Sequence, residues 1–304
     1  MSSLVQRIFS YLIVLLTLWL NSTGFIAKPY EQISDVKYGD GTSQVMDIYL
    51  PKKVSGNASA FLYLHDGNFK DGSRSGMEKD CQIVANKGYV AATMDYSLIT
   101  TPTKTKPNTT SLLTVLDDIQ SAIATLKETA AERGVNLTSL AIAGHGAGGY
   151  YAMMYTAKRS PYANIRIKFV VAKSAPTDFS YELWKDTCSA ADFASLVNAL
   201  AGINLPVSAY ESNTPSAITA CEAVSVTKAL ATRYETIPFL LAYTDTDEQI
   251  PGASSPLLEK ALNDNGIPCS TVLYSNAAHS LDNRILEDAQ YNELLLSYCS
   301  KYFS

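Results

Sequence analysis

The 304-residue chain has few charged residues, only three histidines and no basic segment. Charged residues make up 17% of it, hydrophobic residues 47%, and the net charge is −5. Lysine and arginine are scattered, and the pair Lys104 and Lys106 is too small to form a phosphate-binding stripe. We therefore expect no nucleic acid partner and one compact, mildly acidic domain with a substantial core.

The chain also lacks an apolar run of the roughly 20 residues that a membrane span needs. The most apolar stretch, Ile8 to Leu20, follows Arg7 and precedes small residues that end at Gly24. This order is typical of a secretory signal peptide. We predict a signal peptide at residues 1–24 and a mature domain at residues 25–304. We also predict secretion or another extracytoplasmic location, and no permanent membrane span; an uncleaved anchor is the less favoured alternative.

Short apolar runs alternate with helical patterns, which predicts a mostly parallel sheet with helices on both faces. Two helices are plain from their apolar stripes, Leu112 to Glu132 and Leu281 to Tyr302. Residues 176–236 break the alternation and are expected to form a cap-like insertion over the carboxyl edge of the sheet. The predicted strands are Val45–Leu50, Ala60–Leu64, Val90–Met94, Leu140–Ala143, Phe169–Ala172, Phe239–Tyr243 and Thr271–Tyr274.

No CxxC pair and no paired histidine motif occurs, so we predict neither a metal site nor a cofactor. Export would allow disulfide bonds. Cys188 and Cys221 are the pair we expect first, because both fall in the cap-like insertion and a disulfide there would constrain this long segment. The number of cysteines is odd, so at least one stays unpaired. The five are Cys81, Cys188, Cys221, Cys269 and Cys299.

A serine is missing where the chain has its most informative motif. Residues 140–150 indicate a strand, a sharp turn and a helix, the context of the G-x-S-x-G nucleophile elbow. Gly144 and Gly148 occupy the flanking positions, but Gly146 stands in the serine position. Glycine adopts the strained elbow conformation with little cost. It also removes the side chain that would form an acyl-enzyme.

The other parts of a catalytic triad follow in the expected order of elbow, acid and histidine. Asp247 follows the strand at Phe239–Tyr243, and His279 follows the strand at Thr271–Tyr274. Asp245 competes with Asp247 for the role of the acid, but the spacing to Ile250-Pro251 favours Asp247.

These motifs together resemble the esterase/lipase branch of the α/β-hydrolase superfamily, which includes carboxylesterases, feruloyl-esterase-like proteins and kynurenine-formamidase-like enzymes. The resemblance covers nearly the whole predicted mature chain. It implies an α/β-hydrolase fold with a mostly parallel central sheet, helices on both faces and a cap-like insertion. The matching segments are 46–51, 65–69 for the HGG(G/A)W loop, 88–96 for the GYxVxxxDYR strand, 144–149 for GHSAGG, 247–251 for the acid loop, and His279.

The resemblance also assigns roles. It makes the backbone N–H groups of Gly67, Asn68 and Ala147 the oxyanion hole. It makes Asp247 the group that orients His279, which deprotonates the serine in relatives.

Three positions depart from the family pattern, and two histidines are assigned no chemical role. Besides Gly146, Asp66 places a carboxylate where relatives have glycine, and Ser97 replaces an arginine. Asp66 either crowds the anion site or points into solvent. We interpret His65 and His145 as structural.

Three functions remain compatible with these residues. The first is a pseudoenzyme that binds a protein partner or a small ester-like or amide-like ligand. The second is a weak carboxylic-ester hydrolase in which water attacks, with His279 and Asp247 as the base. The third is an esterase with another nucleophile, for example Ser189 in the cap-like insertion, which no motif supports.

Overall fold

The computed structural model describes residues 28–100, 109–282 and 284–303. The predicted signal peptide, Lys104 and Lys106 lie outside the described residues. The centre of the molecule is an eight-stranded sheet with the order β1-β2-β4-β3-β5-β6-β7-β8. β2 pairs antiparallel with both β1 and β4, and the other neighbours are parallel. The chain therefore has the α/β-hydrolase fold. The strands are β1 (Tyr30–Lys37), β2 (Val45–Pro51), β3 (Gly56–Leu64), β4 (Val90–Met94), β5 (Val135–His145), β6 (Arg166–Lys173), β7 (Phe239–Thr244) and β8 (Cys269–Tyr274).

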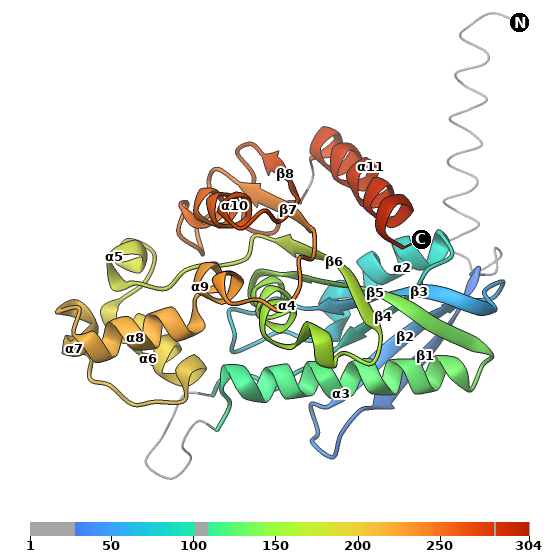
Figure 1. Cartoon of the computed structure of the whole chain (residues 1–304), viewed down its shortest axis with the longest axis horizontal. Coiled ribbons are helices and arrows are strands. Elements are labelled where there is room, and N and C mark those ends of the chain that lie inside the picture. Colours follow the sequence, from blue (N-terminus) through green and yellow to red (C-terminus); the bar gives the residue numbers. More distant parts are fainter. Residues whose placement is uncertain (1–27, 101–108, 283, 304) are drawn as a thin grey trace, which may run out of the picture.

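Helices cover both faces of this sheet, as Figure 1 shows. In β3, Leu62 and Leu64 belong to one hydrophobic cluster while Phe61 and Tyr63 belong to the other, because successive strand side chains point to opposite faces. The first cluster packs against α3 (Leu112–Ala131) and α4 (Gly146–Arg159), and the second against α2 (Glu78–Asn86) and α11 (Ile285–Tyr302). Both faces are apolar, as expected for buried parallel strands.

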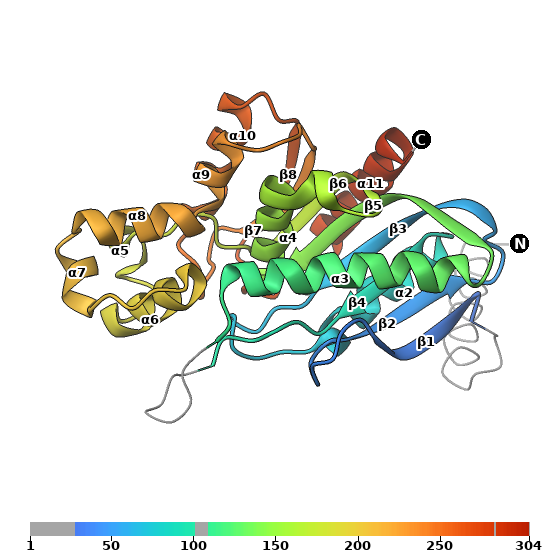
Figure 2. The same ribbon diagram turned by 60° about the horizontal axis from the view of Figure 1, so that its bottom comes forward.

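The segment between β6 and β7 is mainly helical, and it contains the whole of the predicted insertion at residues 176–236. Figure 2 shows α5 to α8 together as a lobe beside the sheet, with α9 nearer to α4. The insertion contributes Phe193, Val197 and Leu230 to the core cluster that α4 also joins, so it is packed onto the sheet domain. Its helices are α5 (Tyr181–Trp184), α6 (Ala190–Ala201), α7 (Val207–Glu211), α8 (Pro215–Val224) and α9 (Val226–Ala231).

Two expectations about elements need correction. β1 was not predicted, because most of its side chains are exposed or half-buried and it carries no apolar run. The last helix begins at Ile285 and not at Leu281. Leu281 has a φ of +59°, which a helix cannot accommodate. The helix at Leu112 begins as predicted, behind a capping box made by Ser111.

Cysteine pairing and membrane crossing were further expectations. The structure does not show the expected disulfide between Cys188 and Cys221: all five cysteines are free thiols. Cys221 is buried within α8, while Cys188 is partly exposed just before α6. Within residues 28–303, apart from the gaps in the description, no helix is long and apolar enough to cross a membrane.

Arg74 lies after β3, and its ion pairs link this segment to strands at the edge of the sheet. Its guanidinium pairs with Asp35, with Asp47 at 3.1 Å and with Asp95 at 2.5 Å. Asp95 therefore has a guanidinium partner although Ser97 replaces the arginine of the family pattern. The Ser97 backbone N–H instead donates to buried Asp118 at 2.8 Å.

Candidate active site

The turn between β5 and α4 is built around glycines that have no room for a side chain. A Cβ at Gly144 would lie 2.3 Å from the carbonyl carbon of Gly148, and a Cβ at Gly148 would lie 2.1 Å from the carbonyl oxygen of Leu64. Gly146 begins α4 with a φ of +49°. These close approaches are the physical reason why the sequence needs glycine around the turn.

Asp66, in the loop after β3, points its carboxylate at Gly146. A Cβ built on Gly146 would lie 2.0 Å from Asp66 Oδ1 and 2.2 Å from its Cγ. The Asp66 carboxylate thus occupies the space that a side chain at position 146 would need. Its side chain is 22% exposed, so the alternative in which Asp66 points into solvent is wrong.

The same carboxylate accepts from two of the three backbone N–H groups that the resemblance assigned to the oxyanion hole. The Ala147 N–H donates to Asp66 Oδ1 at 3.0 Å, and the Asn68 N–H donates to the same oxygen at 3.3 Å. Gly67 has a φ of +145° and a Cβ there would lie 1.9 Å from the Asp71 carbonyl oxygen, so this loop conformation requires glycine. A fixed anion of the protein itself therefore occupies these donors.

His279 and Asp247 meet as the sequence predicts. His279 Nδ1 lies 2.9 Å from both carboxylate oxygens of Asp247. Asp247 also accepts from the backbone N–H groups of Gln249 and Ile250. Asp245 instead accepts from the Asn276 backbone N–H at 2.7 Å. Asp247 is thus the acid that orients the imidazole, and the side chains of His279 and Asp247 are only 4% and 2% exposed.

The second ring nitrogen of His279 contacts a carboxylate. His279 Nε2 lies 3.2 Å from Asp66 Oδ2. In a working triad this nitrogen faces the nucleophile's hydroxyl. His279 is therefore held between two carboxylates, those of Asp247 and Asp66.

The remaining histidines differ in their surroundings. His65 is buried, its ring stacks on Tyr96 with centroids 4.3 Å apart, and its Nδ1 lies 2.7 Å from the Asp66 carbonyl oxygen. These contacts fit a structural histidine. His145 lies beside the site: its Nε2 is 2.9 Å from the His279 carbonyl oxygen, and its Nδ1 is 3.7 Å from Asp66 Oδ2. No sequence pattern assigns His145 a chemical role, so its position next to Asp66 and His279 was missed.

Burial and neighbouring charges shift the pKa values within this cluster. Burial alone would lower the pKa of His279, but hydrogen bonds to Asp247 and Asp66 outweigh burial and raise it to about 9. Burial would raise the pKa of Asp66, yet the hydrogen bond to His279 and the backbone donors hold it well below its usual range. Burial lowers the pKa of His145. The site therefore stabilises charged carboxylates around His279.

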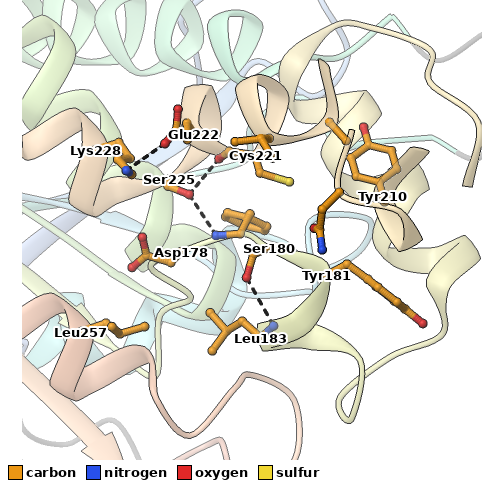
Figure 3. Close-up of a pocket in the computed structure, with 14 residues that line it drawn as sticks. Asp178, Ser180, Tyr181, Leu183, Tyr210, Cys221, Glu222, Ser225, Lys228 and Leu257 are labelled. Atoms are coloured by element: carbon orange, nitrogen blue, oxygen red, sulfur yellow. Dashed lines mark hydrogen bonds and ion pairs between the residues drawn. The ribbon is translucent and has the colours of Figure 1, made fainter. Parts of the chain in front are cut away.

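A cavity of about 330 Å³ lies in the insertion, between α5, α8 and α10 (Ser254–Asp264). Figure 3 shows Asp178 on its wall between Ser225 and Leu257, with the Lys228–Glu222 ion pair nearby. Its other lining residues are largely apolar or aromatic, among them Phe179, Tyr181, Tyr210, Ala217, Ile218 and Cys221. None of the triad positions lines this cavity.

Ser189 has a structural explanation. Its side chain caps α6 by accepting from the Asp192 backbone N–H at 3.1 Å, and its hydroxyl donates to the Asp192 carboxylate at 2.6 Å. A hydroxyl engaged in a helix cap is a poor candidate for an activated nucleophile.

Comparisons with known proteins agree with this fold. The BD-FAE family model matches residues 46–262, which is more than half of the chain. Esterase B from Lactobacillus rhamnosis is similar in structure, with a TM-score of 0.71, 16% identity, and coverage of 96% of this chain and 95% of its own. No curated protein matches the sequence significantly.

Two further solved structures are similar at the level of the fold. A truncated carbohydrate esterase from gut microbiota has a TM-score of 0.68 at 12% identity and covers 90% of this chain and 98% of its own. A thermophilic esterase from the Planctomycetes species Thermogutta terrifontis has a TM-score of 0.64 at 19% identity and covers 89% and 91%. At such identities the likeness concerns the fold alone.

Proposed function

The chain belongs to the BD-FAE family of esterase-like α/β-hydrolases, and from that premise we propose that it is an exported pseudoenzyme. In this proposal the protein keeps the hydrolase frame but binds a small molecule in place of hydrolysing an ester. Export rests on the sequence pattern of residues 1–24. N-terminal sequencing of the exported protein checks it, with a new terminus at residue 25 as the expected result.

The position of the Asp66 carboxylate carries this proposal. It fills the space beside Gly146 and accepts from the Ala147 and Asn68 N–H groups. An ester substrate needs those donors for its developing oxyanion, and it needs a nucleophile at position 146. In this proposal the Asp66 carboxylate already occupies the N–H donors, and glycine at position 146 provides no nucleophile. Both requirements for attack on an ester are therefore missing at the same place.

The cavity in the insertion supports a small-molecule ligand. Its volume of about 330 Å³ is at the lower end of the range for small-molecule pockets, and its walls combine aromatic side chains with a few polar groups. Asp178 Oδ2 is buried on this wall and has no hydrogen-bond partner within the described residues. A compact, partly aromatic ester or amide with an N–H or O–H donor would satisfy that oxygen.

A weak hydrolase with water as the nucleophile is the second candidate. The intact contact between His279 and Asp247 favours it. It requires Asp66 to leave both His279 Nε2 and the Ala147 N–H, which costs two interactions of a charged group. The pseudoenzyme requires no such rearrangement.

Hydrolysis of a short-chain chromogenic ester tests the proposal, measured with a metal chelator present. The four proteins are the natural chain, Gly146→Ser, Asp66→Gly, and Asp66→Gly combined with Gly146→Ser. We expect turnover only in the combined variant, because Gly146→Ser alone brings its side chain against the Asp66 carboxylate. Adding His279→Ala to the combined variant should abolish that turnover. Turnover by the natural chain that disappears with His279→Ala would overturn the proposal and support the second candidate.

The ligand is tested separately by thermal shift with short aromatic esters and amides. We expect stabilisation of the natural chain and a loss of that stabilisation in Leu257→Trp. Leu257 lines the cavity and is 39% exposed, so a larger side chain there narrows the cavity with little effect on the core. Equal stabilisation of both proteins would contradict binding in this cavity.

A further inference from the structure

Three side chains beside Gly146 converge on one point, each with an electron-pair donor. They are Asp66, His145 and His279, and one ligand atom from each lies within 4.8 Å of the other two. Asp66 comes from the loop after β3, His145 from the end of β5, and His279 from the loop after β8. The carboxyl ends of neighbouring parallel strands bring these positions to the same edge of the sheet.

Two of the three separations between these ligand atoms are close to those of a metal site, and the third is within 4.8 Å. In a tetrahedral site with bonds of about 2.0 Å, two ligand atoms are separated by roughly 3.3 Å. Asp66 Oδ2 is 3.2 Å from His279 Nε2 and 3.7 Å from His145 Nδ1. Two imidazoles and one carboxylate form a donor set that suits Zn²⁺ and related divalent transition metals.

Hydrogen bonds on the far side of each ring direct the inner nitrogens, His279 Nε2 and His145 Nδ1, toward Asp66. A carboxylate and a carbonyl oxygen only accept, so His279 Nδ1 donates to Asp247 and His145 Nε2 donates to the His279 carbonyl oxygen. A metal ion would displace the proton that His279 Nε2 donates to Asp66, and His279 Nε2 and His145 Nδ1 would then direct lone pairs toward the ion. Such outer partners are what metal-ligating histidines require to fix their orientation and tautomer.

Charge and access also favour a cation. Asp66 and Asp247 carry two negative charges around one imidazole, and a divalent ion that displaces the second proton of this imidazole would balance both. The side chains of His145 and Asp66 are 17% and 22% exposed, whereas His279 is 4% exposed. Asp66 and His145 are thus accessible to solvent, from which an ion would bind.

We propose that Asp66, His145 and His279 bind a divalent transition-metal ion of the Zn²⁺ class, with Asp247 holding His279 in place. A serine at position 146 would displace the Asp66 carboxylate, since its Cβ would lie 2.0 Å from Oδ1. The glycine at 146 and the aspartate at 66 therefore act together to create the site. The inference rests on the same placement of Asp66 as the proposed function, but it concerns metal binding and not ester turnover.

The test is calorimetric titration of the chelator-treated full chain with Zn²⁺, with Mg²⁺ as the comparison ion. We expect one Zn²⁺ per chain and no Mg²⁺ binding. At about 100 times the dissociation constant, Zn²⁺ should raise the unfolding temperature by roughly 5–10 °C. Co²⁺ should give the visible absorption of a four- or five-coordinate site without the near-ultraviolet bands of thiolate ligation, because the chain has free cysteines.

Variants connect that binding to the three residues. His145→Ala and Asp66→Asn should each weaken Zn²⁺ binding by at least about 100-fold, and Asp247→Asn by about 10–100-fold. Asp245→Asn is the matched control, because it removes a nearby carboxylate that contacts only the Asn276 N–H within the described contacts, and it should bind as the natural chain does. Circular dichroism confirms that each variant is folded. Undiminished binding in folded His145→Ala and Asp66→Asn, or no binding by the natural chain, would overturn the inference.

Ester hydrolysis separates this result from the proposed function. Hydrolysis by the natural chain with chelator present would contradict the pseudoenzyme while the titration still decides the metal site. Failure of Zn²⁺ to bind would overturn the metal site and leave the pseudoenzyme standing. Hydrolysis that appears only with Zn²⁺, and is lost in His145→Ala, would support the metal site and contradict a noncatalytic role.

Discussion

The strongest consequence of the Asp66 position is that Gly146 and Asp66 depend on each other. In the natural background, Gly146→Ser drives its Cβ to 2.0 Å from Asp66 Oδ1, so the carboxylate must leave the Ala147 N–H. In an Asp66→Gly background no carboxylate is present to be displaced. The two substitutions should therefore be far from additive in their effects on folding stability.

The size of the effect follows from two contributions. A non-glycine residue at the φ of +49° costs about 1–3 kcal/mol, and loss of a hydrogen bond to a charged group costs about 1.5–3 kcal/mol. Gly146→Ser should therefore cost about 2.5–6 kcal/mol of unfolding free energy in the natural background. In the Asp66→Gly background it should cost only the backbone contribution, about 1–3 kcal/mol. The coupling energy is then about 1.5–3 kcal/mol.

Chemical denaturation measures this coupling as a double-mutant cycle. The four proteins are the natural chain, Gly146→Ser, Asp66→Gly and the combined variant, all with chelator present. Gly252→Ser is the control, because no atom lies within 4 Å of a Cβ built there. It should be close to neutral and additive with Asp66→Gly. Additive costs for Gly146→Ser and Asp66→Gly would refute the view that Asp66 fills the space beside position 146.

Three other changes test the surrounding structure by denaturation. Gly148→Ala should cost more than about 3 kcal/mol, since its Cβ would lie 2.1 Å from the Leu64 carbonyl oxygen, whereas Gly252→Ala should be near neutral; equal costs would contradict the tight turn. Arg74→Met should cost about 1.5–3 kcal/mol because the partly buried Asp47 and Asp95 lose a charged hydrogen-bond partner, and a cost below about 1 kcal/mol would show that the network is dispensable. Burial raises the pKa of Asp178, so the folded state holds this proton to a higher pH than the unfolded chain, and stability falls as pH rises through that range. Asp178→Asn should therefore raise the free energy of unfolding at about pH 7 but not at about pH 3. An equal change at both pH values would refute the predicted direction of this pH dependence.

The sheet and its order of motifs were largely predictable because they follow from local patterns. Buried strands such as β4 and β7 are short runs in which all residues but one threonine are apolar or aromatic, and such runs are visible without any partner. β1 is an edge strand with mostly exposed side chains, and its pairing with β2 depends on a distant segment. The start of α11 depends on the backbone at Leu281, which no local pattern reveals.

The site was predictable in its parts but not in its contacts. Motif spacing placed Asp247 and His279 correctly relative to each other, because the ends of β7 and β8 lie side by side. The direction of the Asp66 side chain depends on whether position 146 has a side chain, a contact across about 80 residues of sequence. The signal that could have found it is the joint occurrence of an acid at 66 and glycine at 146. Glycine leaves a space next to N–H donors, and a nearby carboxylate is the group that fills it best.

The measurement that tests the central claim most directly is mass spectrometry after incubation with a reactive alkyl phosphonate ester, which labels activated serines covalently. The account predicts no adduct on the natural chain, and an adduct at position 146 in the combined Asp66→Gly and Gly146→Ser variant that disappears with His279→Ala. An adduct on the natural chain, at Ser189 or at any other serine, that is lost with His279→Ala would contradict the account by revealing another activated nucleophile.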